Sequence, residues 1–246
     1  MLLLTPMAGA DGLLSDDFDT TNTGMNDDLA SRQSGSLATV TWSKSANANA
    51  SISGNSLHWS TGNNNAGPIV SPDHDFSDAA SIAGGGFTIS FDVVPNASQF
   101  TGLSLGTSSS GDRLNDGGNL FTYSTTDYGF LIRPTGAGTV FIGGAGHNFS
   151  TTAASSYNVQ LEVLTTGFSA GTAATATLTI NGVAVDSNRA FTWDSEGQNY
   201  IAFSMWRSAG DTSIDNLSIS AIPEPSSGML LIAAVAGLPL IRRRTR

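Results

Sequence analysis

Between residues 11 and 221 the amino-acid sequence alternates between apolar and polar residues in short runs, and no window in it has sustained helical periodicity. In FTISFDV, for example, Phe87, Ile89 and Phe91 alternate with polar residues. A β-strand places successive side chains on opposite faces, so this pattern predicts strands with one buried face and one solvated face. The same alternation recurs in YNVQLEVL, ATATLTI, YIAFSMW and SIDNLSIS.

Turn residues separate these runs. Asn181-Gly182 lies between ATATLTI and VAV, and Asn-Gly is a strong hairpin signal because both residues tolerate the positive φ of a type I′ turn. The chain holds roughly a dozen such runs, divided by Gly, Asn, Ser and Asp, and it has no cysteine. We therefore predict one antiparallel β-sandwich over residues 11–221, stabilised without disulfides.

The charge distribution argues against nucleic acid as a partner. Of the ten basic residues, four lie in the last five positions: Arg242, Arg243, Arg244 and Arg246. Without these four and without Glu224, residues 1–221 hold six basic and 19 acidic residues, a net charge of −13. Such a surface repels nucleic acid and anionic lipid headgroups, and it suits divalent cations or neutral partners.

Four segments together indicate a particular sandwich. They are the opening DDFD (16–19), FTISFDV, the TLTINGVAVD hairpin and the closing SIDNLSIS. This combination resembles the concanavalin A-like, laminin G-type jelly rolls over residues 14–221. The resemblance implies an all-β sandwich whose terminal strands are neighbours, in a superfamily that includes lectins, enzymes and scaffolds. The galactose-binding-type jelly roll is the alternative topology.

The sequence offers no catalytic set, and we predict that the protein is not an enzyme. A glycosidase needs two facing carboxyl groups, yet none of Glu162, Glu196 and Glu224 has a second carboxylate at i+2 or i+4. No GxSxG segment is present to seat a hydrolase serine. The three histidines, His58, His74 and His147, lie far apart without metal-ligand spacing.

No motif in the sequence requires a cofactor. If the protein binds a metal ion, calcium is the ion that its carboxylates would suit. Asp17 and Asp19 in the opening strand would converge with Asp215 in the closing strand if these strands are neighbours, and close carboxylates repel each other unless a cation compensates. The alternative is that DDFD forms a solvated turn. A second acidic segment, GDRLNDGGN (111–119), has Leu114 where an oxygen ligand belongs, so we expect a Gly-rich loop.

Aromatic side chains beside polar loops are candidates for sugar contact. Trp59 in HWSTGNNN and Trp193 in FTWDSEGQN fit this description, and they are the candidates for contact with a glycan. The alternative for each is a half-buried residue at the rim of the core. Trp42 and Trp206 lie in alternating strands, which favours core packing for them.

The N-terminus has features of an export signal. An apolar run, Leu2 to Leu4, is followed by Ala8-Gly9-Ala10, which has the small-x-small form of a signal-peptidase site. We interpret residues 1–10 as the remnant of a signal peptide. A disordered start is the alternative, because the basic segment of a signal peptide is missing.

The C-terminal residues 222–246 contain three elements in order: the step Pro223-Glu224-Pro225, an apolar span at 228–241, and the terminal arginines. As a helix, the 14-residue span would be about 21 Å long, short of the ~30 Å hydrocarbon core. The positive-inside tendency would keep the arginines cytoplasmic. The arrangement resembles the bacterial PEP-CTERM sorting signal, with a plain membrane anchor as the alternative.

The PEP-CTERM resemblance implies a route for the protein. The precursor would insert transiently into the inner membrane through a short hydrophobic helix at 228–241, and an exosortase-type enzyme would remove the tail. The sandwich would then pass to the cell surface or an extracellular polymer matrix. We therefore predict an exported bacterial protein with a structural or adhesive role. The alternative is a glycan-binding, lectin-like module whose partner is an extracellular polysaccharide. In one form of this hypothesis, glycan binding depends on calcium.

Overall fold

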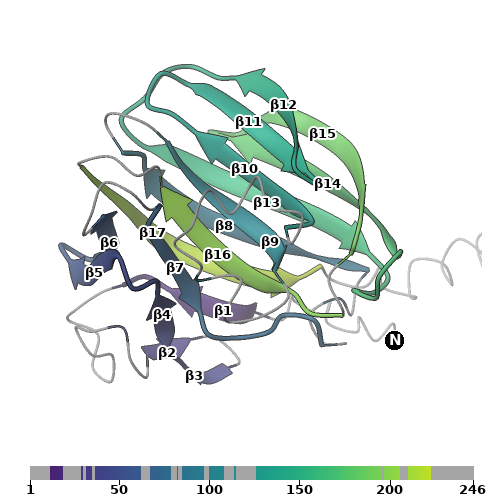
Figure 1. Ribbon diagram of the computed structural model, residues 1–246, viewed down its shortest axis with the longest axis horizontal. Coiled ribbons are helices and arrows are strands. Elements are labelled where there is room, and N and C mark those ends of the chain that lie inside the picture. Colours follow the sequence, from purple (N-terminus) through teal and green to yellow (C-terminus); the bar gives the residue numbers. More distant parts are fainter. Residues whose placement is uncertain are drawn as a thin grey trace, which may run out of the picture.

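Two antiparallel β-sheets packed face to face make up the protein (Figure 1), as the alternation predicted. The computed structural model describes residues 12–18, 29, 32–34, 37–61, 67–78, 82, 85–96, 100–107, 114, 126–194, 197–205 and 210–222. Within these ranges no helix is long and apolar enough to cross a bilayer. The interpreted signal-peptide remnant at 1–10, the sorting motif Pro223-Glu224-Pro225 and the expected hydrophobic helix at 228–241 lie outside them.

The first sheet has the strand order β15-β14-β13-β8-β17-β6-β5, and β1 also pairs with β17. Its strands are β1 (Gly12–Asp16), β5 (Ala48–Ser53), β6 (Ser56–Thr61), β8 (Gly86–Val94), β13 (Tyr157–Thr165), β14 (Ala173–Ile180), β15 (Val183–Thr192) and β17 (Asp211–Ala221).

The second sheet has the order β12-β11-β10-β9-β16-β7-β4. Its strands are β4 (Trp42–Lys44), β7 (Ile69–Pro72), β9 (Thr101–Thr107), β10 (Tyr128–Ile132), β11 (Ala137–Ile142), β12 (Ala145–Ser150) and β16 (Tyr200–Met205). A separate two-stranded ribbon consists of β2 (Arg32–Ser34) and β3 (Leu37–Val40).

The core lies between the two sheets and is built from the alternating residues. Strand β13 alternates between buried and exposed positions along its whole length, so that Val159, Leu161 and Val163 are buried while Glu162 is exposed. Packing these inward faces against each other removes apolar surface from water. This hydrophobic effect is the main force that holds the two sheets together. The largest fully buried side chains are Trp59, Trp193, Tyr128, Tyr157, Phe18, Phe76, Phe87, Phe130 and Phe203.

The predicted Asn-Gly turn joins β14 to β15. Asn181 and Gly182 have φ values of 50° and 76°, in the left-handed region that the type I′ turn requires. The Asn181 side chain also stabilises the turn, because its Oδ1 accepts a hydrogen bond from the backbone N–H of Asn158 at 2.8 Å. The turn is thereby tied to the neighbouring strand β13.

The two terminal strands are neighbours, as the jelly-roll resemblance implied. Strand β1 runs antiparallel to the second half of β17, with Asp16 opposite Leu217. The first half of β17 pairs with β6 instead. A β-bulge lies between these halves, between Asp215 and Ser218, and Asn216 within it has a φ of 52°. The bulge is therefore where β17 changes its partner.

Candidate functional site

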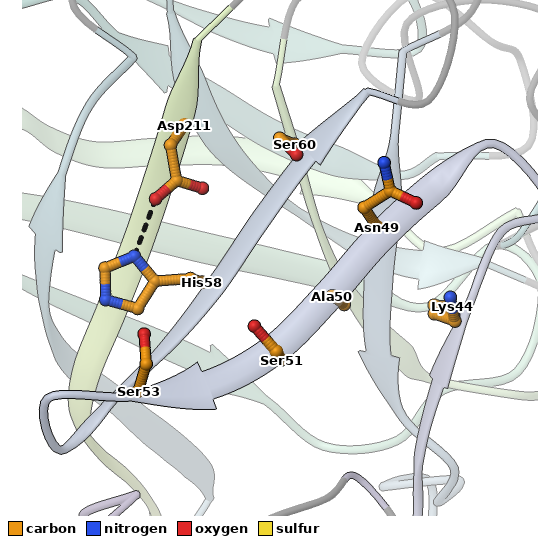
Figure 2. Close-up of a pocket in the computed structure, with 8 residues that line it drawn as sticks. All are labelled: Lys44, Asn49, Ala50, Ser51, Ser53, His58, Ser60 and Asp211. Carbon is orange, nitrogen blue, oxygen red and sulfur yellow. Dashed lines mark hydrogen bonds and ion pairs between the residues drawn. The ribbon is translucent and has the colours of Figure 1, made fainter.

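A polar groove lies over β5, β6 and the start of β17, on the outer face of the first sheet (Figure 2). Two cross-strand rows form its floor. In one row Ser51 lies opposite His58, which lies opposite Ser213, and in the other Ser60 lies between Asn49 and Asp211. The groove has a volume of about 440 Å³ and is lined by Lys44, Asn49, Ala50, Ser51, Ser53, His58, Ser60 and Asp211.

A histidine–carboxylate pair stands at one side of the groove. His58 Nδ1 lies 2.7 Å from Asp211 Oδ2, and the two side chains are 32% and 54% exposed. With Asp211 ionised, this contact places the proton of a neutral imidazole on Nδ1 and leaves Nε2 as an acceptor. Figure 2 shows the Ser53 hydroxyl directed toward the His58 ring. The pair thus fixes an imidazole beside serine hydroxyls, within reach of a ligand.

The groove does not contain an assembled hydrolase triad. A serine nucleophile needs a hydrogen bond to the imidazole that activates it. In the described part of the chain, His58 hydrogen-bonds to Asp211 and to no serine hydroxyl. The arrangement is therefore suited to holding a ligand by hydrogen bonds.

Lys44 defines another side of the groove. Its ammonium donates a hydrogen bond to the backbone carbonyl oxygen of Ala48 at 2.8 Å, which anchors the only lysine of the chain where β4 approaches β5. Together with the amide of Asn49 and the hydroxyls of Ser51 and Ser60, the lining offers both donors and acceptors. Among these lining residues there is no Phe, Tyr or Trp side chain.

The prediction that Trp59 and Trp193 contact a glycan is wrong. Both indoles are 0% exposed. Trp59 packs edge-on against Phe203, with ring centroids 6.5 Å apart. Trp193 contacts Phe168, with ring centroids 4.9 Å apart, and donates a hydrogen bond from Nε1 to Thr165 Oγ1 at 2.9 Å. Both rings belong to the core between the sheets.

The physical reason is the two-residue period of a strand. His58 and Ser60 lie on the outer face of β6, so Trp59 between them must point inward. The polar neighbours that made Trp59 resemble a sugar platform are on the opposite face from its ring. The same alternation, applied strictly, could have placed His58 on the outer face of this strand. Asp211 lies far away in sequence and had no local signal.

The bulge in β17 gathers carboxylates from three strands. Asp215 lies directly opposite Asp92 of β8. Partial burial raises the pKa of the Asp215 carboxyl, the hydrogen bond from the backbone N–H of Asn216 lowers it, and the neighbouring charges of Asp92, Asp17 and Asp16 raise it further. The predicted convergence of Asp17 with Asp215 is thus present, while Asp19 lies outside the described residues. Among the described residues, no three His, Asp or Glu side chains form a metal-binding group.

Asp92 is held between two asparagines at this point. Its Oδ1 accepts a hydrogen bond from Asn158 Nδ2 and its Oδ2 from Asn216 Nδ2, both at 2.9 Å. Asp215 has a different arrangement, since its Oδ1 accepts from the backbone N–H of Asn216 at 2.7 Å. The Asp92 carboxylate thus accepts two side-chain hydrogen bonds that compensate its negative charge, whereas Asp215 accepts one backbone hydrogen bond. Removing the charge of Asp215 should therefore relieve repulsion between the neighbouring carboxylates.

Asp215→Asn is expected to raise the melting temperature at pH 7 by roughly one to two degrees, the size of a surface-charge effect in a domain of this size. A carboxyl with a raised pKa in the folded state binds its proton more tightly there, so it costs stability above that pKa. Asparagine keeps an oxygen for the Asn216 N–H. The difference between the two proteins should shrink as the pH falls toward 3.8, the ordinary pKa of the group. Thermal melts from pH 3 to 8 would measure it, and a lower melting temperature for the variant at pH 7 would contradict it.

Comparison with known proteins identifies the fold. No protein-family model matches this chain, and no curated protein matches it. A protein of unknown function with a galectin-like fold from Bacillus subtilis is similar at 14% identity, over 74% of this chain and 90% of its own, with a TM-score of 0.50. The carbohydrate recognition domain of Emp46p, in its potassium-bound form, is similar at 10% identity, over 72% of this chain and 87% of its own, with a TM-score of 0.50.

At these identities the likeness concerns the fold alone. Both structures span most of their own length in the match, so the whole sandwich is compared and not an isolated hairpin. Their lectin-like architecture agrees with the concanavalin A-like resemblance of the sequence. The chain has the fold of the lectin-like jelly rolls.

Proposed function

We propose that this protein is a carbohydrate-binding module of an exported surface or matrix protein, and that the groove over β5, β6 and β17 is its glycan site. The observation that supports this most directly is the lining of the groove. Hydroxyls, an amide, an imidazole paired with a carboxylate and an ammonium lie together on a face of a lectin-like sandwich.

The chemistry of the lining suits a sugar. Each sugar hydroxyl is both a donor and an acceptor, so a binding surface needs both kinds of group. Ser51 and Ser60 supply hydroxyls that can act either way, Asn49 supplies an amide, and Lys44 donates only. A volume of about 440 Å³ lies within the range usual for small-molecule sites.

The export part of the proposal rests on the two ends of the sequence. Residues 1–10 are proposed to be the remnant of a signal peptide, and Pro223-Glu224-Pro225 with the following apolar span and arginines to be a sorting signal. An exosortase-type enzyme would remove this tail and release the sandwich toward the cell surface. Cleavage near Pro223 in the exporting cell, seen by mass spectrometry of the surface fraction, would support this route.

A structural or adhesive role without a defined ligand is the second candidate. It is favoured by one observation, the lack of a Phe, Tyr or Trp side chain in the lining of the groove. Aromatic faces contribute much of the contact energy in many binding sites, and a groove without them binds more weakly. The two functions differ in whether any saccharide is held in the groove.

Ser51→Tyr is expected to weaken binding of the bound saccharide by at least ten-fold, because the phenol ring would fill the middle of the groove. Binding of the full chain to neutral and uronate-containing polysaccharides, measured by array and then by titration, tests this. Thr179→Tyr is the matched control, since Thr179 lies on β14, away from the groove. If the native chain binds no saccharide, with or without calcium, the structural role stands. If Ser51→Tyr and the native chain bind the saccharide equally well, the glycan site lies outside this groove.

Calcium is proposed only for the acidic residues beside the bulge. If Asp17, Asp19 and Asp215 share a calcium ion, millimolar calcium should raise the melting temperature of the native chain and leave that of Asp215→Asn unchanged. The opposing carboxylates would then be neutralised by the cation. A melting curve of the native chain that is identical in calcium and in EDTA would remove this proposal without affecting the groove.

A further inference from the structure

The edges of the two sheets differ in how they are protected. An edge strand presents unpaired N–H and C=O groups, which can pair with a strand of another chain. Proteins usually prevent this with charged side chains, bulges, very short strands or a covering segment. The strands at the ends of the two sheets are β15 and β5 in the first and β12 and β4 in the second.

Three of these edges have a protective feature. Strand β15 is irregular, with register shifts against β14, Asn188 at a φ of 51°, and an Asp186–Arg189 ion pair of 2.7 Å. Strand β4 has only three residues, and the backbone N–H of Trp42 donates to the Leu29 carbonyl at 2.7 Å. On β5, the Lys44 ammonium occupies the Ala48 carbonyl. Each of these edges is therefore short, irregular or, in the case of the six-residue strand β5, has a charged side chain bound to one of its carbonyls.

Strand β12 lacks such features. It has six residues, Ala145–Ser150, and pairs with β11 without a register shift. All of its residues except Phe149 are exposed, and none is Asp, Glu, Lys, Arg or Pro. Phe149 covers Gly138 on β11, where a side chain at Gly138 would collide with the ring, and this cross-strand contact keeps the strand in register. In the described part of the chain, β11 is the one strand paired with β12.

The charge around β12 also differs from that of the rest of the protein. The chain has a net charge of −10, yet no aspartate or glutamate occurs between Asp127 and Glu162. This stretch contains β10, β11 and β12, and Arg133 is its single residue with a permanent charge. Strand β15 lies beside β12 at the same rim of the sandwich (Figure 1). Its one acidic residue, Asp186, is paired with Arg189. Two copies of this acidic protein can therefore meet at β12 without opposing carboxylates.

We propose that β12 is a self-association edge, through which two copies of this chain pair β12 against β12 in antiparallel orientation about a two-fold axis. The pairing would join the two seven-stranded sheets into one continuous sheet. An isologous contact suits this strand because both copies offer the same row of six residues without Asp, Glu, Lys or Arg. A single strand pair buries less than a standard interface of about 1,600 Å², so the association is weak and favoured where copies are crowded.

A cysteine scan tests the proposal, because the natural chain has no cysteine. In an antiparallel pair about a two-fold axis, opposite residues share a face, so one residue must lie opposite its own copy. A cysteine there has its Cα within the 4.4–6.8 Å that a disulfide needs. We would place single cysteines at positions 145 to 150 of the full chain and oxidise each at several protein concentrations. Ala184→Cys, an exposed position on β15, is the matched control.

One position of β12 is expected to form disulfide-linked dimers at least ten-fold faster than Ala184→Cys. Its sequence neighbours should form them slowly, because each of them lies opposite a different residue of the second copy. Adding a lysine at the position before the reactive cysteine should suppress the dimer, since the two ammonium groups would then lie diagonally across the strand pair on one face of the sheet. Tryptophan fluorescence would check that each variant is folded. Equal rates at all six positions and at Ala184→Cys would indicate random collisions and overturn the proposal. Absence of dimers at every position, as expected if β12 pairs with a strand of a different protein, would overturn it as well.

Discussion

Trp193→Ala is expected to lower the free energy of unfolding by about 3–5 kcal/mol, the cost of emptying a large buried aromatic site. The indole is fully buried and contacts Phe168 and Phe191, with ring centroids 4.9 Å and 5.0 Å away. The substitution also leaves Thr165 Oγ1 without the Nε1 donor. Urea denaturation followed by circular dichroism would measure the loss as a lower midpoint at similar slope.

Trp193→Phe is the control for this prediction. It keeps most of the ring volume and removes the hydrogen bond to Thr165, so a loss of about 1 kcal/mol is expected. A cavity effect predicts a large difference between the alanine and phenylalanine variants. If Trp193→Ala instead keeps full stability and loses saccharide affinity, the indole contacts a ligand and its assignment to the core is wrong.

Asp16→Ala is expected to lower the free energy of unfolding by about 2–4 kcal/mol, because it leaves two buried donors without an acceptor. The Asp16 carboxylate is 1% exposed. Its Oδ1 accepts from the backbone N–H of Phe18 at 2.9 Å, and its Oδ2 accepts from Trp42 Nε1 at 3.2 Å. The first bond holds Phe18 at a φ of 51°, a conformation that a phenylalanine rarely adopts alone. Thermal and urea unfolding would measure the loss.

Asp17→Ala provides the comparison. Asp17 is the next residue and is exposed, so its replacement should change the free energy of unfolding by no more than about 0.5 kcal/mol. Both variants remove one carboxylate from the same acidic region. A common electrostatic effect would therefore change both proteins alike, and equal stabilities for the two variants would refute the structural role assigned to Asp16.

The strands could be predicted because their signal is local. In β8 and β13 the inward residues from Phe87 to Val93 and from Tyr157 to Val163 carry apolar or aromatic side chains, and the two-residue period of a strand fixes which side chains share a face. The hairpin at Asn181-Gly182 depends on the backbone preferences of two adjacent residues. The proximity of Asp17 and Asp215 required the further assumption that the first and last strands are neighbours, and the pairing of β1 with β17 confirms it.

The groove could not be predicted in the same way. Its lining consists of small polar residues from β4, β5, β6 and β17, and none of them belongs to a motif. The His58–Asp211 pair joins residues 153 positions apart. The sequence directed attention to Trp59, the conspicuous residue of β6, whereas the exposed residues of that strand are the ones beside it.

By itself, the sequence determined that this chain forms an antiparallel sandwich, which apolar residues strands such as β8 and β13 bury, and where its Asn-Gly turn lies. These properties follow from backbone preferences and from the alternation of apolar residues, which act over a few neighbouring positions. Only the tertiary structure decided that Trp59 and Trp193 are core residues, that His58 meets Asp211, and that β12 ends a sheet without protection. The order of strands in a sheet depends on the packing of both sheets together, and that order decides which distant polar residues become neighbours and which backbone groups remain unpaired.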